Sequence, residues 1–141
     1  VMLALYRASQ AGVKIDLIIR GICCLRPGVP GLSENIQVRS VIGRFLEHTR
    51  VYWFGHNGKP EVYCSSADGM VRNLVNRVEV AFPVEDRSLV NRLEEDLDAC
   101  LRDNCQSWVL QPDGRYLQNQ PSPEEERFAS QLVLLDRLSA K

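Results

Sequence analysis

The chain has 141 residues, of which 45% are hydrophobic and 25% are charged, a composition typical of a soluble globular domain. Its formal net charge of −1 argues against a generally basic nucleic-acid-binding protein. The longest aliphatic run is LVLL at 132–135, far shorter than the roughly 20 apolar residues that span a bilayer. No charged-then-apolar leader is present, so we expect neither a transmembrane nor a secreted protein.

Charge is distributed unevenly along the chain. Residues 1–80 carry ten basic and six acidic side chains, whereas residues 81–141 carry seven basic and twelve acidic ones. Eight of the ten basic residues in the first part are arginines, whose planar guanidinium binds phosphate through paired hydrogen bonds. For any single arginine, ordinary solvated surface charge is the alternative interpretation.

The cysteines indicate a reducing compartment. There are five, an odd number, and no two have the Cys-x-x-Cys spacing of a metal site. No histidine lies at zinc-finger spacing from the adjacent Cys23 and Cys24. We therefore expect buried thiols in a cytosolic protein and no structural metal.

The first half of the chain predicts strands that follow a short helix. Apolar spacing predicts a helix over 1–12 that ends at Gly12, and because it begins without an N-cap we expect the chain to be a piece of a longer one. The β-branched run 14–21 is typical of a strand in a parallel sheet, and the Pro- and Gly-rich segment 23–35 predicts a loop. The elements expected next are strands at 35–43, 49–54, 61–66 and 76–84, one helical turn at 44–48, and a turn at 56–60.

The last third of the sequence predicts two helices and a hairpin, which we expect to serve packing and not chemistry. Leucines at every fourth position from 89 to 101 predict a helix over 86–103, and a Pro-Asp-Gly turn predicts a hairpin over 107–118. A capping box that starts at Ser122 predicts a helix over 122–141. The class expected from these elements is α/β, with a mixed sheet flanked by helices.

Three features of 48–74 are candidates for chemistry. His48 lies at the entry to an apolar strand, where open α/β sheets bind ligands, although a packing role is the alternative. His56 stands beside Asn57-Gly58, so we expect an exposed turn histidine without a function. The segment SSADGMVRNL (65–74) either holds phosphate at a helix start or merely caps that helix through Ser65, Ser66 or Asp68. Neither a Gly-x4-Gly-Lys-Ser/Thr loop nor a Gly-x-Gly-x-x-Gly fingerprint is present.

Two longer segments carry a family resemblance. DLIIRGICCLRPGVPGLSENIQVRSVIGRFLEHTRVYWF (16–54) and SSADGMVRNLVNRVEV (65–80) closely resemble the C-terminal catalytic domain of type 1 polyphosphate kinases. The resemblance implies a phospholipase D-like α/β fold, with residues 1–141 forming most of the second C-terminal domain and lacking its N-terminal part. It also implies reversible transfer of the terminal phosphate of ATP to polyphosphate, with Mg²⁺.

The same resemblance implies roles for two residues. Arg20 matches the ATP-binding arginine of the family, and His48 matches its second active-site histidine, which contacts nucleotide and acts as acid or base. The histidine that becomes phosphorylated, and the metal ligands, belong to preceding parts of such proteins. We therefore expect no metal ligand on this chain and no activity from the chain alone.

The resemblance further implies a cytoplasmic homo-oligomer, or one peripheral to the inner face of the membrane. Its partners would be ATP, ADP, polyphosphate and the preceding domains, without nucleic acid. The arginines that are candidates to line a path for the anionic polymer, with a structural ion pair as the alternative for each, are Arg26, Arg39, Arg44, Arg50 and Arg72.

Two other functions stay open. The phospholipase D pattern His-x-Lys-x4-Asp is replaced here by His48-Thr49-Arg50 with Gly55 at the Asp position, and Gly69 stands where the polyphosphate kinases commonly have Trp. Ser65-Ser66-Ala67-Asp68 stands near the Gly-Ser-x-Asn position, and Glu79 near a downstream acidic residue. A phospholipase D-like phosphodiesterase is one alternative, and a non-catalytic polyphosphate-binding module is the other.

Overall fold

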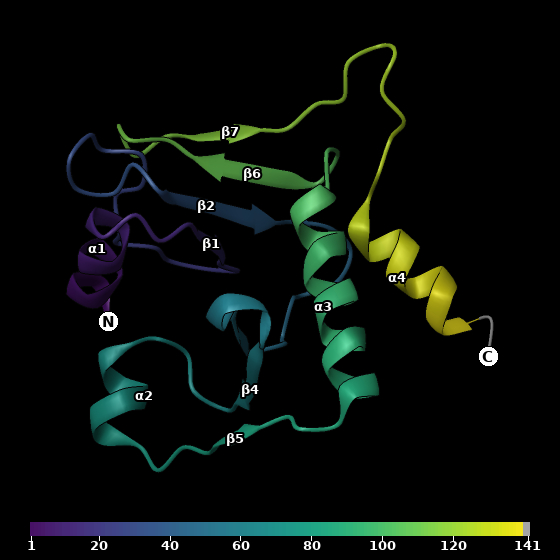
Figure 1. Ribbon diagram of the computed structural model, residues 1–141. Coiled ribbons are helices and arrows are strands. Elements are labelled where there is room, and N and C mark those ends of the chain that lie inside the picture. Colours follow the sequence, from purple (N-terminus) through teal and green to yellow (C-terminus); the bar gives the residue numbers. More distant parts are fainter. Residues whose placement is uncertain (140–141) are drawn as a thin grey trace. The chain divides into compact units, whose positions relative to one another are not determined.

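The structure, a computed structural model, describes residues 1–139, which fall into two compact units. Unit 1 combines residues 1–47 with the segment that starts at Ala99, and unit 2 comprises His48–Asp98. Each unit contains a β-sheet and helical segments (Figure 1), so the predicted mixed α/β class with sheets flanked by helices is confirmed.

Unit 1 contains a four-stranded mixed sheet in the order β1-β2-β6-β7. Its strands are β1 (Ile15–Ile18), β2 (Ile36–Val41), β6 (Ser107–Leu110) and β7 (Tyr116–Gln118). β1 and β2 are parallel, as the β-branched run predicts, while β6 and β7 continue the sheet as an antiparallel hairpin. The loop between β1 and β2 contains the irregular segment expected from its prolines and glycines.

The hydrophobic core of unit 1 lies between this sheet and helix α1 (Met2–Gln10). Leu25, Ile36, Val38 and Leu110 are buried there, and Leu5 and Tyr6 of α1 pack against them with other half-buried side chains. Gly12 has φ +85°, which a residue with a side chain rarely adopts, and its N–H donates to the carbonyl of Ser9. The predicted glycine stop of the first helix is confirmed.

Unit 2 contains a three-stranded antiparallel sheet, β3 (Val51–Phe54), β4 (Glu61–Ser65) and β5 (Ala81–Pro83), in that order. The first two strands are joined by the one-turn 3₁₀ helix η1 (His56–Gly58), in which Asn57 has φ 52° and Gly58 φ 85°. The predicted Asn-Gly turn is confirmed. Helix α2 (Val71–Asn76) lies between β4 and β5 in the chain.

Helix α3 (Arg87–Arg102) agrees with the predicted helix over 86–103. Asp86 caps it, because one carboxylate oxygen accepts hydrogen bonds from the N–H groups of Ser88 and Leu89 at 2.8 and 3.2 Å. Its buried apolar positions are Val90, Ala99 and Cys100, whereas Leu89 of the leucine stripe is exposed.

The expected helical start at Ser122 is wrong. Helix α4 (Ser130–Ser139) begins eight residues later, and the end of the predicted helix at 140–141 lies outside the described residues. Ser122 forms a local turn with Glu125, but the N–H and hydroxyl of Ser130 both donate to a carboxylate oxygen of Asp103, at 2.7 and 2.8 Å. A residue 27 positions away in sequence therefore caps α4.

Two further local predictions are wrong. Residues 44–48 form no helical turn, because the side chain of Gln131 occupies both the N–H and the C=O of Phe45. The strand predicted over 76–84 is only β5, and before it Glu79 and Val80 are held by hydrogen bonds to the backbone and hydroxyl of Ser66. Among the described residues, no helix is long and apolar enough to cross a membrane.

Candidate functional site

His48 is the first residue of unit 2, and it is exposed. Its Nδ1 lies 3.3 Å from Nη1 of Arg50, which also donates to the His48 carbonyl at 3.2 Å. Because a guanidinium can only donate, Nδ1 accepts in this contact and the hydrogen of the neutral ring lies on Nε2. The ring nitrogen that remains for another partner is therefore Nε2.

Arg50 is itself held by an ion pair. Its Nε donates to a carboxylate oxygen of Asp68 at 2.8 Å, and the two side chains are 19% and 26% exposed. This hydrogen bond, with the charges of Asp68 and Glu79, raises the pKa of Arg50. Arg50 stands where the phospholipase D pattern has lysine, and this lysine-equivalent position is therefore engaged with a carboxylate.

Glu79 is the second carboxylate of this part of unit 2. The hydroxyl of Ser66 donates to one of its oxygens, and Nδ2 of Asn73 donates to the other at 2.8 Å. These two hydrogen bonds, with the nearby cations Arg77 and Arg50, lower the pKa of Glu79 below its ordinary value. We call this set the Arg50–Glu79 cluster; its members are His48, Arg50, Ser66, Asp68, Asn73 and Glu79.

The segment 65–74 does not provide the helix cap that one of its two sequence interpretations expects. Helix α2 has Met70 at its N-cap and no side-chain capping hydrogen bond, so the expected cap by Ser65, Ser66 or Asp68 is wrong. The hydroxyls are engaged elsewhere: Ser65 donates to the carbonyl of Val80 at 3.2 Å, and Ser66 donates to Glu79. The phosphate-holding role of this loop stays a prediction, with both hydroxyls already bonded within the protein.

Asn73 is the member of the cluster whose role no sequence pattern identified. It is only 3% exposed, although it is a polar residue in a short helix. Its partner Glu79 is six residues away, beyond the three- or four-residue spacing at which side chains of one helix meet. Only the return of the chain from α2 toward β5 brings the amide and the carboxylate together.

Arg20 belongs to unit 1, directly after β1. Its Nη1 donates to the backbone carbonyl of Glu47 at 3.0 Å, so the guanidinium contacts the residue that precedes His48 in the sequence. The side chain is half-buried. Its predicted contact with nucleotide phosphate stays a prediction.

The side chains of the other candidate arginines make different contacts. Arg26 donates twice to the carbonyl of Pro112, at 3.0 and 2.7 Å, and Arg39 donates to the carbonyl of Leu101. Arg44 is exposed and lies over the ring of Phe45, 5.5 Å from its centroid, and Arg72 is exposed on α2. Arg26 and Arg39 thus have structural partners within unit 1, as Arg50 has in unit 2.

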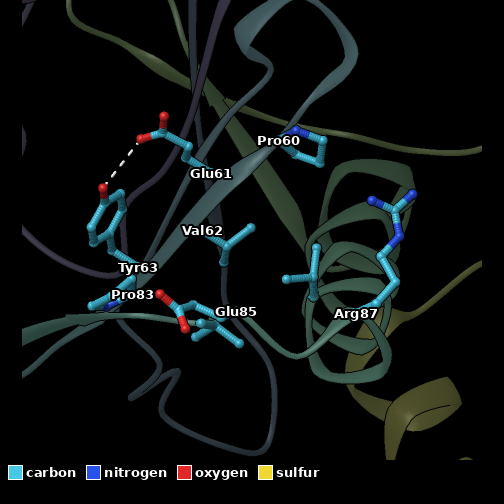
Figure 2. A pocket seen from close by; sticks show the side chains of 9 residues that line it. Pro60, Glu61, Val62, Tyr63, Pro83, Glu85 and Arg87 are labelled. Carbon is cyan, nitrogen blue, oxygen red and sulfur yellow. Dashed lines mark hydrogen bonds between the residues drawn. The ribbon is translucent and has the colours of Figure 1, made fainter.

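A hollow of about 450 Å³ on unit 2 is formed by β4, β5 and the start of α3 (Figure 2). The hydroxyl of Tyr63 donates to Glu61 at 3.1 Å on one side, and this bond raises the pKa of Tyr63. Glu85 lies in the loop after β5, and Arg87 is the first residue of α3. The hollow is lined by other residues than the Arg50–Glu79 cluster, so the candidate chemistry lies outside it.

No group of three or more His, Cys, Asp or Glu side chains that could hold a metal ion occurs within residues 1–139. Asp68 and Glu79 are the two carboxylates of the Arg50–Glu79 cluster, and each accepts hydrogen bonds from cationic or polar side chains. The expectation that the Mg²⁺ ligands lie outside this chain stays a prediction.

Comparison with known proteins assigns the family. A family model described as "Polyphosphate kinase C-terminal domain 2" matches residues 1–131. This chain belongs to that family. The polyphosphate kinase of Pseudomonas putida is 57% identical over 139 residues, which are 99% of this chain and 19% of the relative. That of Thermosynechococcus vestitus is 58% identical over 137 residues, 97% of this chain and 19% of the relative.

A solved structure agrees with this assignment. The crystal structure of polyphosphate kinase from Porphyromonas gingivalis has a TM-score of 0.91 and 42% sequence identity, over 96% of this chain and 21% of that chain. The chain thus spans about a fifth of the length of the relatives it matches. The predicted family and α/β fold are confirmed, and residues 16–54 and 65–80, which carry the resemblance, lie within the matched region.

Proposed function

We propose that this chain is the second C-terminal domain of a longer polyphosphate kinase. That protein transfers the terminal phosphate of ATP to polyphosphate, reversibly, and this chain supplies part of its nucleotide and phosphate site. The observation that carries the proposal is the family match over residues 1–131, together with relatives named polyphosphate kinase that are five times as long. The isolated chain is inactive in this proposal, because the nucleophilic histidine lies in a preceding domain.

Arg20 is proposed to bind the phosphates of ATP. Phosphoryl transfer asks little covalent chemistry of the protein and depends on positioning and on neutralising the negative oxygens. A guanidinium suits this task since it stays charged at all physiological pH values and presents several donors. The bond to the Glu47 carbonyl occupies Nη1 and holds the head group in one orientation.

His48 is proposed to exchange a proton with the transferring phosphate or its leaving group. Histidine is suited to this role because its ring changes protonation near neutral pH. The contact with Arg50 directs Nδ1 toward the guanidinium and supports Nε2 as the reacting nitrogen. The ion pair between Arg50 and Asp68 keeps this contact in place.

Other components of the proposed reaction lie outside this chain. Mg²⁺ accompanies ATP and is held by ligands outside this chain, and within this chain Asp68 and Glu79 already accept hydrogen bonds from Arg50, Ser66 and Asn73. The protein is a cytoplasmic homo-oligomer, or is peripheral to the inner face of the membrane, and its partners are ATP, ADP, polyphosphate and its own preceding domains. Phosphorylation of a histidine in one of those domains splits the transfer into two steps.

A non-catalytic polyphosphate-binding module is the second candidate, and it describes the isolated chain. The arginine-rich first part of the sequence favours it, and binding that weakens with salt would support it. A phospholipase D-like phosphodiesterase is disfavoured, because Arg50 replaces the lysine of that pattern and is engaged with Asp68.

The test is His48→Ala in the full-length protein. ATP-dependent polyphosphate synthesis should fall by roughly 10²- to 10⁴-fold, the usual contribution of a positioned acid or base. His56→Ala is the matched control, since His56 is an exposed residue of η1 outside the Arg50–Glu79 cluster, and its activity should stay near that of the parent. A folded His48→Ala enzyme with near-normal synthesis would contradict the proposed role.

A further inference from the structure

We infer that Gln131 is a positioning residue for the segment that leads into His48. The inference rests on the proposed function of His48, and it concerns a residue 83 positions away in the sequence. Gln131 is only 4% exposed, in the first turn of α4. Such a buried amide needs a hydrogen-bond partner for each of its polar groups, and all of those found here are on residues 45 and 47.

The contacts form a clamp on Phe45. The N–H of Phe45 donates to Oε1 of Gln131 at 2.9 Å, and Nε2 of Gln131 donates to the carbonyl of Phe45 at 2.7 Å. The same Nε2 also donates to a carboxylate oxygen of Glu47 at 2.8 Å. One side chain thus satisfies both backbone groups of one residue and a side chain two residues further on. We call these three hydrogen bonds the Gln131 clamp.

Residues next to the Gln131 clamp further restrict the path of the segment that it holds. A Cβ atom at Gly43 would overlap Oε1 of Gln131 and the end of the Gln106 side chain, so any other residue there would displace these two amides. On the far side of Glu47, Arg20 donates to the backbone carbonyl of that residue at 3.0 Å. The segment from Gly43 to Glu47 contains no helix or strand, and these side chains from distant parts of unit 1 define its path.

Gln131 itself is anchored. The residue before it, Ser130, donates through its N–H and its hydroxyl to Asp103, which is 1% exposed. The start of α4 therefore has a defined position relative to the end of α3 within unit 1. A fixed amide that clamps residue 45 and a fixed arginine that binds residue 47 together orient the peptide from which His48 extends.

The test compares two matched substitutions in the full-length enzyme. Gln131→Glu keeps the size of the side chain and its acceptor for Phe45, but it removes the Nε2 donor and places a second carboxylate beside Glu47. Asn104→Asp makes the same chemical change in a similar pair of bonds, since Asn104 accepts from the N–H of Phe128 at 2.7 Å and donates to the carbonyl of Glu126 at 2.9 Å. Asn104 is in unit 1 and has no hydrogen bond to residues 43–47.

We expect Gln131→Glu to lower kcat by about 10- to 100-fold with little change in KM for ATP, because a small misplacement of a reacting group has effects of this size. Asn104→Asp should lose a similar amount of thermal stability and keep kcat within about threefold. Amide hydrogen exchange of the peptide covering 44–48 should speed up in the first variant only. Adding Glu47→Gln to Gln131→Glu restores a side-chain donor and should recover kcat about threefold or more.

The outcomes separate this inference from the proposed function. Equal losses of kcat in Gln131→Glu and Asn104→Asp would overturn the positioning role, and so would a lowered kcat without faster exchange at 44–48. If Gln131→Glu does not fold, Gln131→Asn, which keeps the amide but shortens its reach, is compared with Asn104→Asp in the same assays. His48→Ala is measured alongside: near-normal activity in that variant would overturn the proposed function, whatever Gln131→Glu shows.

Discussion

The two units of the chain are stabilised in different ways. Unit 1 has an apolar core, with Ile36 and Val38 at 1% and 0% exposure, and a buried polar centre at Asp103. Within unit 2, all of which the structure describes, only Val62, Ala67, Asn73 and Val90 are buried. Its sheet instead leaves large side chains such as Phe54 and Phe82 exposed, at 54% and 53%.

Polar contacts supplement the small apolar core of unit 2. The Arg50–Glu79 cluster connects the residues before β3, the loop after β4, helix α2 and the segment before β5 through one ion pair and several hydrogen bonds. Salt screens such contacts, and a pH change that neutralises one partner weakens them. Burial of apolar surface depends little on salt or on pH. The candidate reaction residue His48 thus lies in the unit with the smaller core, whereas the Gln131 clamp holds residues 45 and 47 of unit 1.

The largest expected effect is on unit 1, from Asp103→Ala. Asp103 accepts hydrogen bonds from the N–H groups of Cys105, Gln106 and Ser107 and from the N–H and hydroxyl of Ser130. Removing this buried carboxylate leaves these donors unpaired and should lower the free energy of unfolding by about 3–4 kcal/mol. Denaturant unfolding is followed by the fluorescence of Trp108, which lies in β6 of unit 1, in a Trp53→Phe background.

The matched control is Asp113→Ala. Asp113 also accepts from a backbone N–H and a side chain, both of Arg115, but it lies in an exposed turn of the same unit. Asp113→Ala should lower the free energy of unfolding much less than Asp103→Ala does. Equal effects of the two changes would mean that Asp103 is accessible to water in solution.

A smaller effect separates the apolar contacts of the two units. Ile36→Ala in unit 1 should lower the free energy of unfolding by about 3 kcal/mol, because it leaves a cavity in the core. Phe82→Ala in unit 2 should cost less than about 1 kcal/mol, since the ring is half exposed. Denaturant titration of each variant measures both values, and a Phe82→Ala cost as large as that of Ile36→Ala would contradict the comparison.

The smallest expected effect is the acid sensitivity of unit 2. Hydrogen bonds from Ser66 and then Asn73 lower the pKa of Glu79 in the folded state, so its ionised form stabilises the fold. This contribution is complete above the ordinary glutamate pKa of about 4.5 and is lost as the pH falls from there through the lowered pKa. Fluorescence of Trp53 in β3 should therefore report loosening of unit 2 on acidification, in a Trp108→Phe background.

Glu79→Gln is the control for this acid effect, since an amide does not titrate and should flatten the pH dependence of the Trp53 signal. Asp86, whose pKa is lowered by Ser88 and Leu89, contributes in the same direction at the start of α3. An unchanged pH profile in Glu79→Gln would assign the acid sensitivity to Asp86 and other carboxylates.

Local patterns predicted what neighbouring residues decide. The helix stop at Gly12, the Asn57-Gly58 turn and the helix over 86–103 are confirmed, because each depends on backbone conformation or on side chains within one or two turns. The long specific segments 16–54 and 65–80 also identified the family. Arg20 and His48 were named through that resemblance, and their roles stay predictions.

The tertiary structure decided the elements whose partners are far away in the sequence. The start of α4 depends on Asp103 and not on Ser122, and the path of residues 44–47 depends on Gln131. The polar partners of Glu79 likewise come from two other segments. For α4 and for residues 44–47, hydrogen bonds between residues brought together by folding outweigh a local preference, because a local cap contributes only about 1 kcal/mol and a buried group without a partner costs more.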